Sequence, residues 1–138
     1  MSRSGYSDDI DDTWQWIKWR GQVASAIRGK RGQAFLKEML AAMDAMPEKK
    51  LVANALEADG QVCAIGTVGR ARGVDMSKVD PEDYSTVAGT FGIAEPLAQE
   101  IVYMNDEAFG SYWCKTPEDR FQAMRAWIVG HIRKEETA

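Results

Sequence analysis

The sequence predicts a mainly α-helical fold, a compact bundle of about five helices. Apolar residues recur at helical spacing over most of the 138-residue chain, and most of these runs begin or end at a capping residue, a glycine or a proline. The 45% hydrophobic and 28% charged residues are the balance of a globular protein. We expect one helical domain at residues 10–138, preceded by a polar, disordered arm at residues 1–9.

The first helix is expected to start at Asp12 or Thr13, either of which can cap it, and to end near Arg28. Its apolar side chains form two rows: Trp14, Ile17, Ala24 and Trp16, Trp19, Val23, Ile27. The indoles of Trp14, Trp16 and Trp19 cannot share one narrow stripe of a helix. We therefore expect one or two of them in the core, and the remaining one facing a partner or a second subunit.

Four more helices are expected, at residues 34–46, 80–92, 94–107 and 116–132. A basic break with two glycines, RGKRG at residues 28–32, separates the first helix from the second, which Pro47 ends. Thr116 is the expected N-cap of the last helix, with Asp119 three residues on, as in a capping box in which Asp replaces Glu. That helix has an amphipathic face made of Phe121, Met124, Trp127, Ile128 and Ile132.

Two stretches between these helices have two interpretations each. Near residues 51–65 an Asp-Gly pair between short apolar runs indicates a β-hairpin, whereas the Ala, Leu and Glu content suits a helix followed by a turn. In GTVGRARG, residues 66–73, the glycines are best explained as a loop between helices. The alternative is a phosphate-binding loop, although the spacing matches neither the Walker A motif nor the dinucleotide fingerprint.

Charge is unevenly distributed in a chain of net charge −4. Within residues 18–37 every charged residue is basic, namely Lys18, Arg20, Arg28, Lys30, Arg31 and Lys37. Residues 79–114 contain no Lys or Arg and hold the acids Asp80, Glu82, Asp83, Glu95, Glu100, Asp106 and Glu107. The two segments either orient a charged partner or match each other within one fold.

Residue types that carry chemistry are scarce. His131 is the only histidine and falls on the apolar side of the last helix, where a buried or boundary position is expected. Cys63 and Cys114 are far apart in sequence and complete no usual zinc set. With one histidine and no Gly-x-Ser-x-Gly motif, a nucleophile has no evident base. We predict no metal, no cofactor and no enzymatic activity; an enzyme with an unrecognised site is the third hypothesis.

Cysteine usage and hydropathy indicate the compartment. Two cysteines without Cys-x-x-Cys spacing fit a reducing cytosol better than a secreted context. The N-terminus is polar and acidic, and no apolar run approaches about 18 residues. The expected location is cytoplasmic, with no membrane contact.

The segment TVAGTFGIAEPLAQEI, residues 86–101, resembles the helix-turn-helix family. Ala88 stands where two helices approach closely, Gly92 stands at the turn, and the packing positions are Val87, Phe91, Ile93, Leu97 and Ile101. The resemblance implies a DNA-binding transcriptional regulator, which is the second hypothesis. The second helix offers Glu95, Gln99 and Glu100 and no cation, so phosphate contacts would have to come from residues 18–37.

The chain also resembles small helical proteins encoded by bacteriophages and prophages, above all in KWRGQVASAIRGKRGQAFLKEML and FGIAEPLAQEIVYMNDE. This resemblance implies a bacterial host cell and a role directed at the host or its defences. Such proteins act by occupying a macromolecular surface, and inhibition of antiviral systems, including CRISPR-type systems, is one example.

The first hypothesis is accordingly a non-enzymatic protein that binds a host or defence-system protein or nucleoprotein complex. Trp and Arg are enriched among residues that dominate binding affinity. The predicted partner-binding residues are Trp14, Trp16, Trp19, Arg20, Arg28, Lys30 and Arg31. Nucleic-acid contact through residues 18–37, a nucleic-acid-mimicking face at residues 80–107 and a homodimer stay open.

Overall fold

The computed structural model describes residues 13–53, 55–58, 60–77, 79–108 and 116–132. This part of the chain is mainly helical, with one two-stranded hairpin, which confirms the predicted fold class. Its helices are α1 (Thr13–Arg28), α2 (Lys30–Asp44), α3 (Ala64–Arg72), α4 (Tyr84–Phe91), α5 (Glu95–Tyr103), a π-helical turn η1 (Met104–Ala108) and α7 (Pro117–His131). The predicted arm at residues 1–9 lies outside the described residues.

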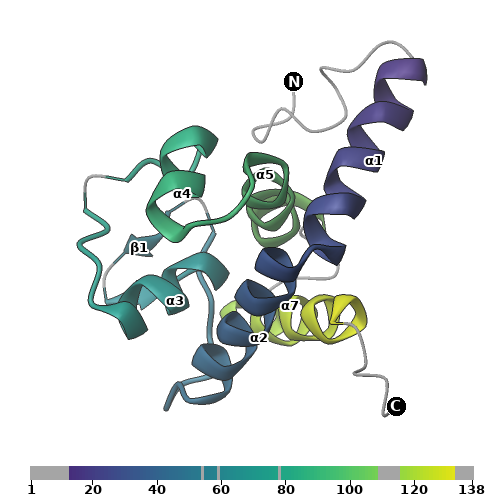
Figure 1. Ribbon diagram of the computed structural model, residues 1–138. Helices are drawn as coiled ribbons and strands as arrows, with labels where there is room; N and C mark the ends of the chain where they lie inside the picture. The colour runs from purple at the N-terminus through teal and green to yellow at the C-terminus, as the bar shows by residue number, and fades with distance from the viewer. Residues whose placement is uncertain (1–12, 54, 59, 78, 109–115, 133–138) are drawn as a thin grey trace.

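Helices α1 and α2 follow one another along one side of the bundle, α3 and α7 both lie against α2, and α4 lies beside α5 (Figure 1). Helix α5 packs against α1, α3 and α4. The core gathers one face of each helix, and its largest fully buried side chains include Leu36, Met39, Met43, Phe91, Leu97, Ile101, Phe121, Met124 and Ile128. No helix in this described part is long and apolar enough to cross a bilayer.

The break between α1 and α2 is shorter than predicted. Only Gly29 leaves the helical conformation, with φ −64° and ψ 157°, and α2 begins at Lys30 instead of residue 34. Gly32 lies inside α2 and is buried, because a Cβ at this position would collide with the backbone carbonyl of Ala26 in α1. This glycine therefore permits close packing of the two helices and does not interrupt α2.

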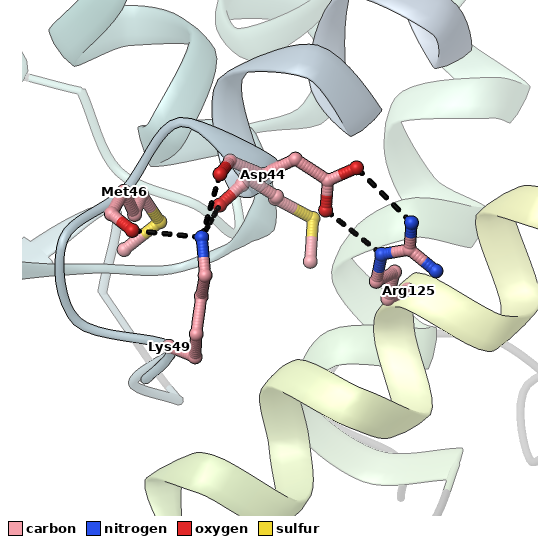
Figure 2. A network of polar contacts seen from close by, with 5 residues as sticks. Asp44, Met46, Lys49 and Arg125 are labelled. Carbon is pink, nitrogen blue, oxygen red and sulfur yellow. Dashed lines mark hydrogen bonds and ion pairs between the residues drawn. The ribbon is translucent and has the colours of Figure 1, made fainter.

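Two basic side chains, Lys49 and Arg125, bind polar groups at the C-terminal end of α2 (Figure 2). The Lys49 ammonium donates hydrogen bonds to the carbonyl oxygens of Asp44 at 2.6 Å and Met46 at 2.8 Å. Arg125 of α7 holds the Asp44 carboxylate at 2.8 and 3.1 Å. Positive groups at a helix C-terminus satisfy free carbonyls and complement the helix dipole. The ion pair between Asp44 and Arg125 also joins α2 to α7.

The ambiguous segment forms the predicted hairpin. Strand β1 (Glu57–Ala58) pairs antiparallel with β2 (Gln61–Val62), with Glu57 opposite Val62, and Gly60 has a φ of 79°. A helix here, the other interpretation, is wrong. The turn needs the positive φ that glycine adopts without steric cost.

The prediction of a loop at residues 66–73 is wrong, because these residues belong mostly to α3. The Cys63 thiol accepts a hydrogen bond from the Gly66 amide at 3.3 Å and caps the helix. Gly66 and Gly69 are buried: a Cβ would collide with the Leu56 carbonyl at the first and with Met76 at the second. The phosphate-loop alternative is wrong for the same reason, since these glycines face the interior and not a ligand.

The predicted helices at residues 80–92 and 94–107 are confirmed with altered ends. Asp83, and not Asp80, caps α4 by accepting a hydrogen bond from the Thr86 amide at 3.2 Å. Gly92 ends α4 with a φ of 73°, and α5 continues into η1. In the last helix the predicted cap is confirmed: the Thr116 hydroxyl accepts a hydrogen bond from the Asp119 amide at 3.0 Å.

Asn105 in η1 holds the hairpin region to the helices. It is 2% exposed, its Oδ1 accepts a hydrogen bond from the Ala64 amide at 3.2 Å, and its Nδ2 donates to the Val52 carbonyl at 2.9 Å. Its backbone carbonyl accepts a hydrogen bond from Arg120 of α7. One buried amide thus satisfies backbone groups on both sides of the hairpin.

Candidate binding face of helix α1

Helix α1 has one face turned to the core and one turned to solvent. On the inner face Val23 and Ile27 are buried, and Trp19 packs against the core. We call the opposite side the outer face; its residues are all exposed and stand at positions i, i+3, i+4, i+7, i+11 and i+14, namely Trp14, Ile17, Lys18, Gly21, Ser25 and Arg28. This spacing places them on one stripe of the helix.

The three clustered tryptophans separate along these two faces. Trp14 is 70% exposed at the start of the outer face. The first turns of α1 extend beyond α5 (Figure 1). Trp16 is half-buried, with the Arg20 guanidinium 5.9 Å from its ring centroid. Trp19 is half-buried at the edge of the core. The second of the two apolar rows is therefore the one that faces inward.

Arg20 is held in an ion pair on the inner side. One nitrogen of its guanidinium lies 3.1 Å from each carboxylate oxygen of Glu100, whose side chain is 4% exposed, against 37% for Arg20. Burial raises the pKa of the Glu100 carboxyl, and the charge and hydrogen bonds of Arg20 oppose that rise. This contact joins the basic segment to the acidic one within the fold, and it removes Arg20 from the set of cations offered to a partner.

The remaining predicted cations lie at the surface. Arg28, Lys30 and Arg31 are exposed around the junction of α1 and α2. The ion pairs found among the described residues involve other cations, so these three and Lys18 are neutralised by none of them. The predicted site is thus only partly brought together: Trp14, Arg28, Lys30 and Arg31 face solvent, whereas Trp16, Trp19 and Arg20 turn to the bundle.

A shallow open groove runs beside the outer face. Lys18, Gly21 and Ser25 of α1 form one side of it, and Ala94 and Pro96 at the start of α5 form the other. Sequence reasoning selected Lys18 only as part of the basic segment 18–37, and it did not select Ile17, Gly21 or Ser25. These residues follow Trp14 at helical spacing, which was the only signal in the sequence that could have selected them. The spacing indicates an exposed face only once it is known which apolar row faces the core.

Elsewhere in the described residues, the thiol of Cys63 and the imidazole of His131 are engaged in packing. Burial raises the pKa of the Cys63 thiol to about 12, and this side chain caps α3. His131 is half-buried, as expected for a boundary histidine: its ring lies 4.6 Å from that of Trp127, and its Nδ1 is 2.8 Å from the Trp127 carbonyl oxygen. The structurally described ranges contain no group of three His, Cys, Asp or Glu side chains that could hold a metal ion.

Comparisons of the chain with protein-family models, with curated proteins and with solved structures find no match. The class of protein is therefore defined by the fold and the surface alone. It is a small helical bundle whose first helix presents an apolar and basic face to solvent.

Proposed function

We propose that this chain is a non-enzymatic phage-type protein that binds a host or defence-system macromolecule and modulates or inhibits it. The observation that carries the proposal is the exposure of Trp14 at 70% and Ile17 at 55%, one turn apart on the outer face of α1. The host-directed part of the proposal rests on the resemblance to phage proteins.

The energetic reason is the apolar area left in water. With about 200 Å² for an indole side chain, an exposure of 70% leaves about 140 Å² of Trp14 uncovered. At about 25 cal/mol per Å², covering this area is worth about 3.5 kcal/mol. Tryptophan at the centre of an interface is among the residues that contribute most to affinity. A partner that covers Trp14 and Ile17 recovers this free energy, which the bundle itself leaves unused.

A DNA-binding regulator, the alternative, has less support. Helix α5 would be the helix that enters a groove of DNA, but it packs against α1, α3 and α4, and five of its nine residues are buried. Glu100 is one of these five and is held by Arg20. What supports the alternative is the pair α4 and α5 with Gly92 at the turn.

The test is affinity capture from bacterial lysate with the full chain, followed by mass spectrometry. The wild type is compared with Trp14→Ala/Ile17→Ala and with Val129→Ala, a matched control because Val129 is an exposed apolar residue on α7 at 47%. The expected result is a macromolecule captured by the wild type and by Val129→Ala and lost with the double variant. Equal capture by all three proteins, or capture of nothing, contradicts the proposal.

A further inference from the structure

The outer face of α1 has the dimensions of a helix-binding surface. From Trp14 to Arg28 it follows the helix for 14 residues, which at 1.5 Å per residue is about 21 Å. That length accommodates about four turns of a second helix. Amphipathic helices bind in this way, with side chains at i, i+3, i+4 and i+7 in a groove of the partner.

Packing within the bundle does not require a glycine at Gly21, in the middle of this face. A Cβ at this position would meet nothing within 4 Å, although glycine inside a helix costs about 1 kcal/mol relative to alanine. Gly21 and Ser25 leave the backbone of α1 accessible along the groove that Ala94 and Pro96 close on the other side. The apolar pair Trp14 and Ile17 lies at one end of the same face. The surface thus combines an apolar anchor with room for a close approach.

Both charged residues of the outer face are basic. Helix α1 contains no acidic residue, and Lys18 and Arg28 flank Gly21 on the outer face. Lys30 and Arg31 continue the positive charge beyond Arg28. The third cation of α1, Arg20, is already paired with Glu100. The charges left for a partner are therefore basic, and complementarity requires acidic groups opposite them.

Two other occupants match this surface less well. A second copy of the chain would set one basic α1 against another, and like charges at an interface are costly. Lys18 and Arg28 lie ten residues, about 15 Å, apart along the helix with uncharged residues between them on the outer face. A nucleic acid instead presents a phosphate every few ångströms along its path, and on the outer face only Trp14 offers a ring for a base to stack on.

We propose that the outer face of α1 binds an acidic amphipathic helix of a partner protein. The apolar side chains of that helix cover Trp14 and Ile17, and its carboxylates pair with Lys18 and Arg28. This inference rests on the proposed binding function and adds the chemistry of the partner.

The test is a selection from a displayed library of 20-residue helical peptides in which acidic, basic and apolar residues are all allowed at the varied positions. The full chain is the bait. We expect enriched peptides with a net negative charge and apolar residues spaced by three or four. The enriched peptides are then synthesised, and their affinity for each variant is measured. Lys18→Glu should lower this affinity at least tenfold. Lys37→Glu makes the same change in net charge on α2 and should change the affinity by less than twofold. Circular dichroism checks that each variant is folded.

A second pair of variants separates shape from charge. Gly21→Leu fills the groove and should abolish peptide binding. Gly89→Leu is the matched control, because a Cβ on Gly89 of α4 would also meet nothing within 4 Å and this residue lies away from α1.

Enrichment of basic or uncharged peptides would overturn the inference. An affinity for the selected peptides that Lys18→Glu and Gly21→Leu leave unchanged would also overturn it. Binding of a 20-nucleotide single strand or duplex, or self-association of the chain, that is lost in these two variants would also overturn it. The proposed function survives such results if the lysate capture still depends on Trp14 and Ile17. If that dependence is absent while acidic helices bind the outer face, the proposed function fails, and the acidic helix is then a ligand of this face without the proposed host-directed role.

Discussion

The ion pair between Arg20 and Glu100 predicts an unequal response to removal of its two members. Arg20→Met leaves the Glu100 carboxylate, 4% exposed, without its compensating charge, which is expected to cost about 3 kcal/mol at pH 7. Glu100→Gln leaves a guanidinium that is 37% exposed and can be hydrated, so about 1 kcal/mol is expected. The double variant should lie near Glu100→Gln, which gives a coupling free energy of about 3 kcal/mol.

The pH dependence of the same variants identifies the cause. Burial raises the pKa of Glu100 above its ordinary value of 4.5, and loss of Arg20 should raise that pKa further. An acid with a raised pKa in the folded state binds its proton more tightly there than in the unfolded chain. We therefore compare the free energy of unfolding of Arg20→Met with that of the double variant. Protonated Glu100 stabilises the fold of Arg20→Met; this stabilisation is fully present below pH 4.5 and is lost as the pH rises through the pKa of folded Glu100. Between the pKa of Glu100 in the unfolded chain and its pKa in the folded protein, the free energy of unfolding falls by about 1.4 kcal/mol per pH unit.

The assay is urea unfolding followed by circular dichroism at pH 4.5, 5.5 and 7 for the wild type, both single variants and the double variant. The free energy of unfolding should be lowest for Arg20→Met at pH 7, and its deficit should shrink at pH 4.5. Two results would refute the reasoning: Glu100→Gln costing as much as Arg20→Met at pH 7, or a deficit of Arg20→Met that does not change with pH.

Three further predictions concern the interior. Asn105→Ala leaves the buried Ala64 amide and the partly buried Val52 carbonyl without their partner and should lower the free energy of unfolding by about 3 kcal/mol in urea titrations; a loss under about 1 kcal/mol would contradict the bridging role. Gly66→Ala should destabilise by about 3 kcal/mol, because its Cβ meets a backbone carbonyl, whereas Gly89→Ala should stabilise by about 0.5 kcal/mol; equal melting temperatures would be evidence against this packing. In a Cys114→Ser variant the remaining thiol, Cys63, should not react with a disulfide reagent at pH 8 until denaturant is added, and labelling as fast as that of free glutathione would refute its burial.

Local signals predicted most of the helices, because each depends on neighbours within a few residues. Thr116 caps α7 through the amide three residues on, and the turn at Gly60 needs only a positive φ. Both effects are encoded within four residues of sequence. Elements of this kind are readable from a single chain, and their ends are less so: Asp80 and Asp83 are equally good caps by composition, and only Asp83 is used.

Helix α3 was mispredicted because two of its glycines are required by packing against groups outside the helix. Gly66 packs against the carbonyl of Leu56, and Gly69 packs against Met76. From sequence alone, three glycines within eight residues indicate flexibility. In the fold Gly66 and Gly69 allow a short buried helix to approach its neighbours, while Gly73 ends that helix with a φ of 75°. The tertiary gain exceeds the low helix propensity of glycine.

The candidate site was predicted in part for a related reason. The sequence shows two apolar rows on α1 but not which of them the bundle covers. Val23 and Ile27 extend the row of Trp16 and Trp19 toward α2, so this row has the larger area to bury against the core. Arg20 lies on the same side, and its partner Glu100 is 80 residues away, which no local pattern reveals.

The buried ion pair also has a bearing on specificity. Both rows of α1 are apolar, and the larger area of the inner row favours the observed orientation over one turned about the helix axis toward Trp14 and Ile17; the ion pair adds to that preference. In the turned orientation Arg20 would leave the Glu100 carboxylate buried without its partner, a cost of several kcal/mol. The pair contributes little net stability, since its desolvation offsets its attraction, but it penalises the alternative strongly. On this argument Arg20 keeps Trp14 and Ile17 at the surface without itself contacting a partner.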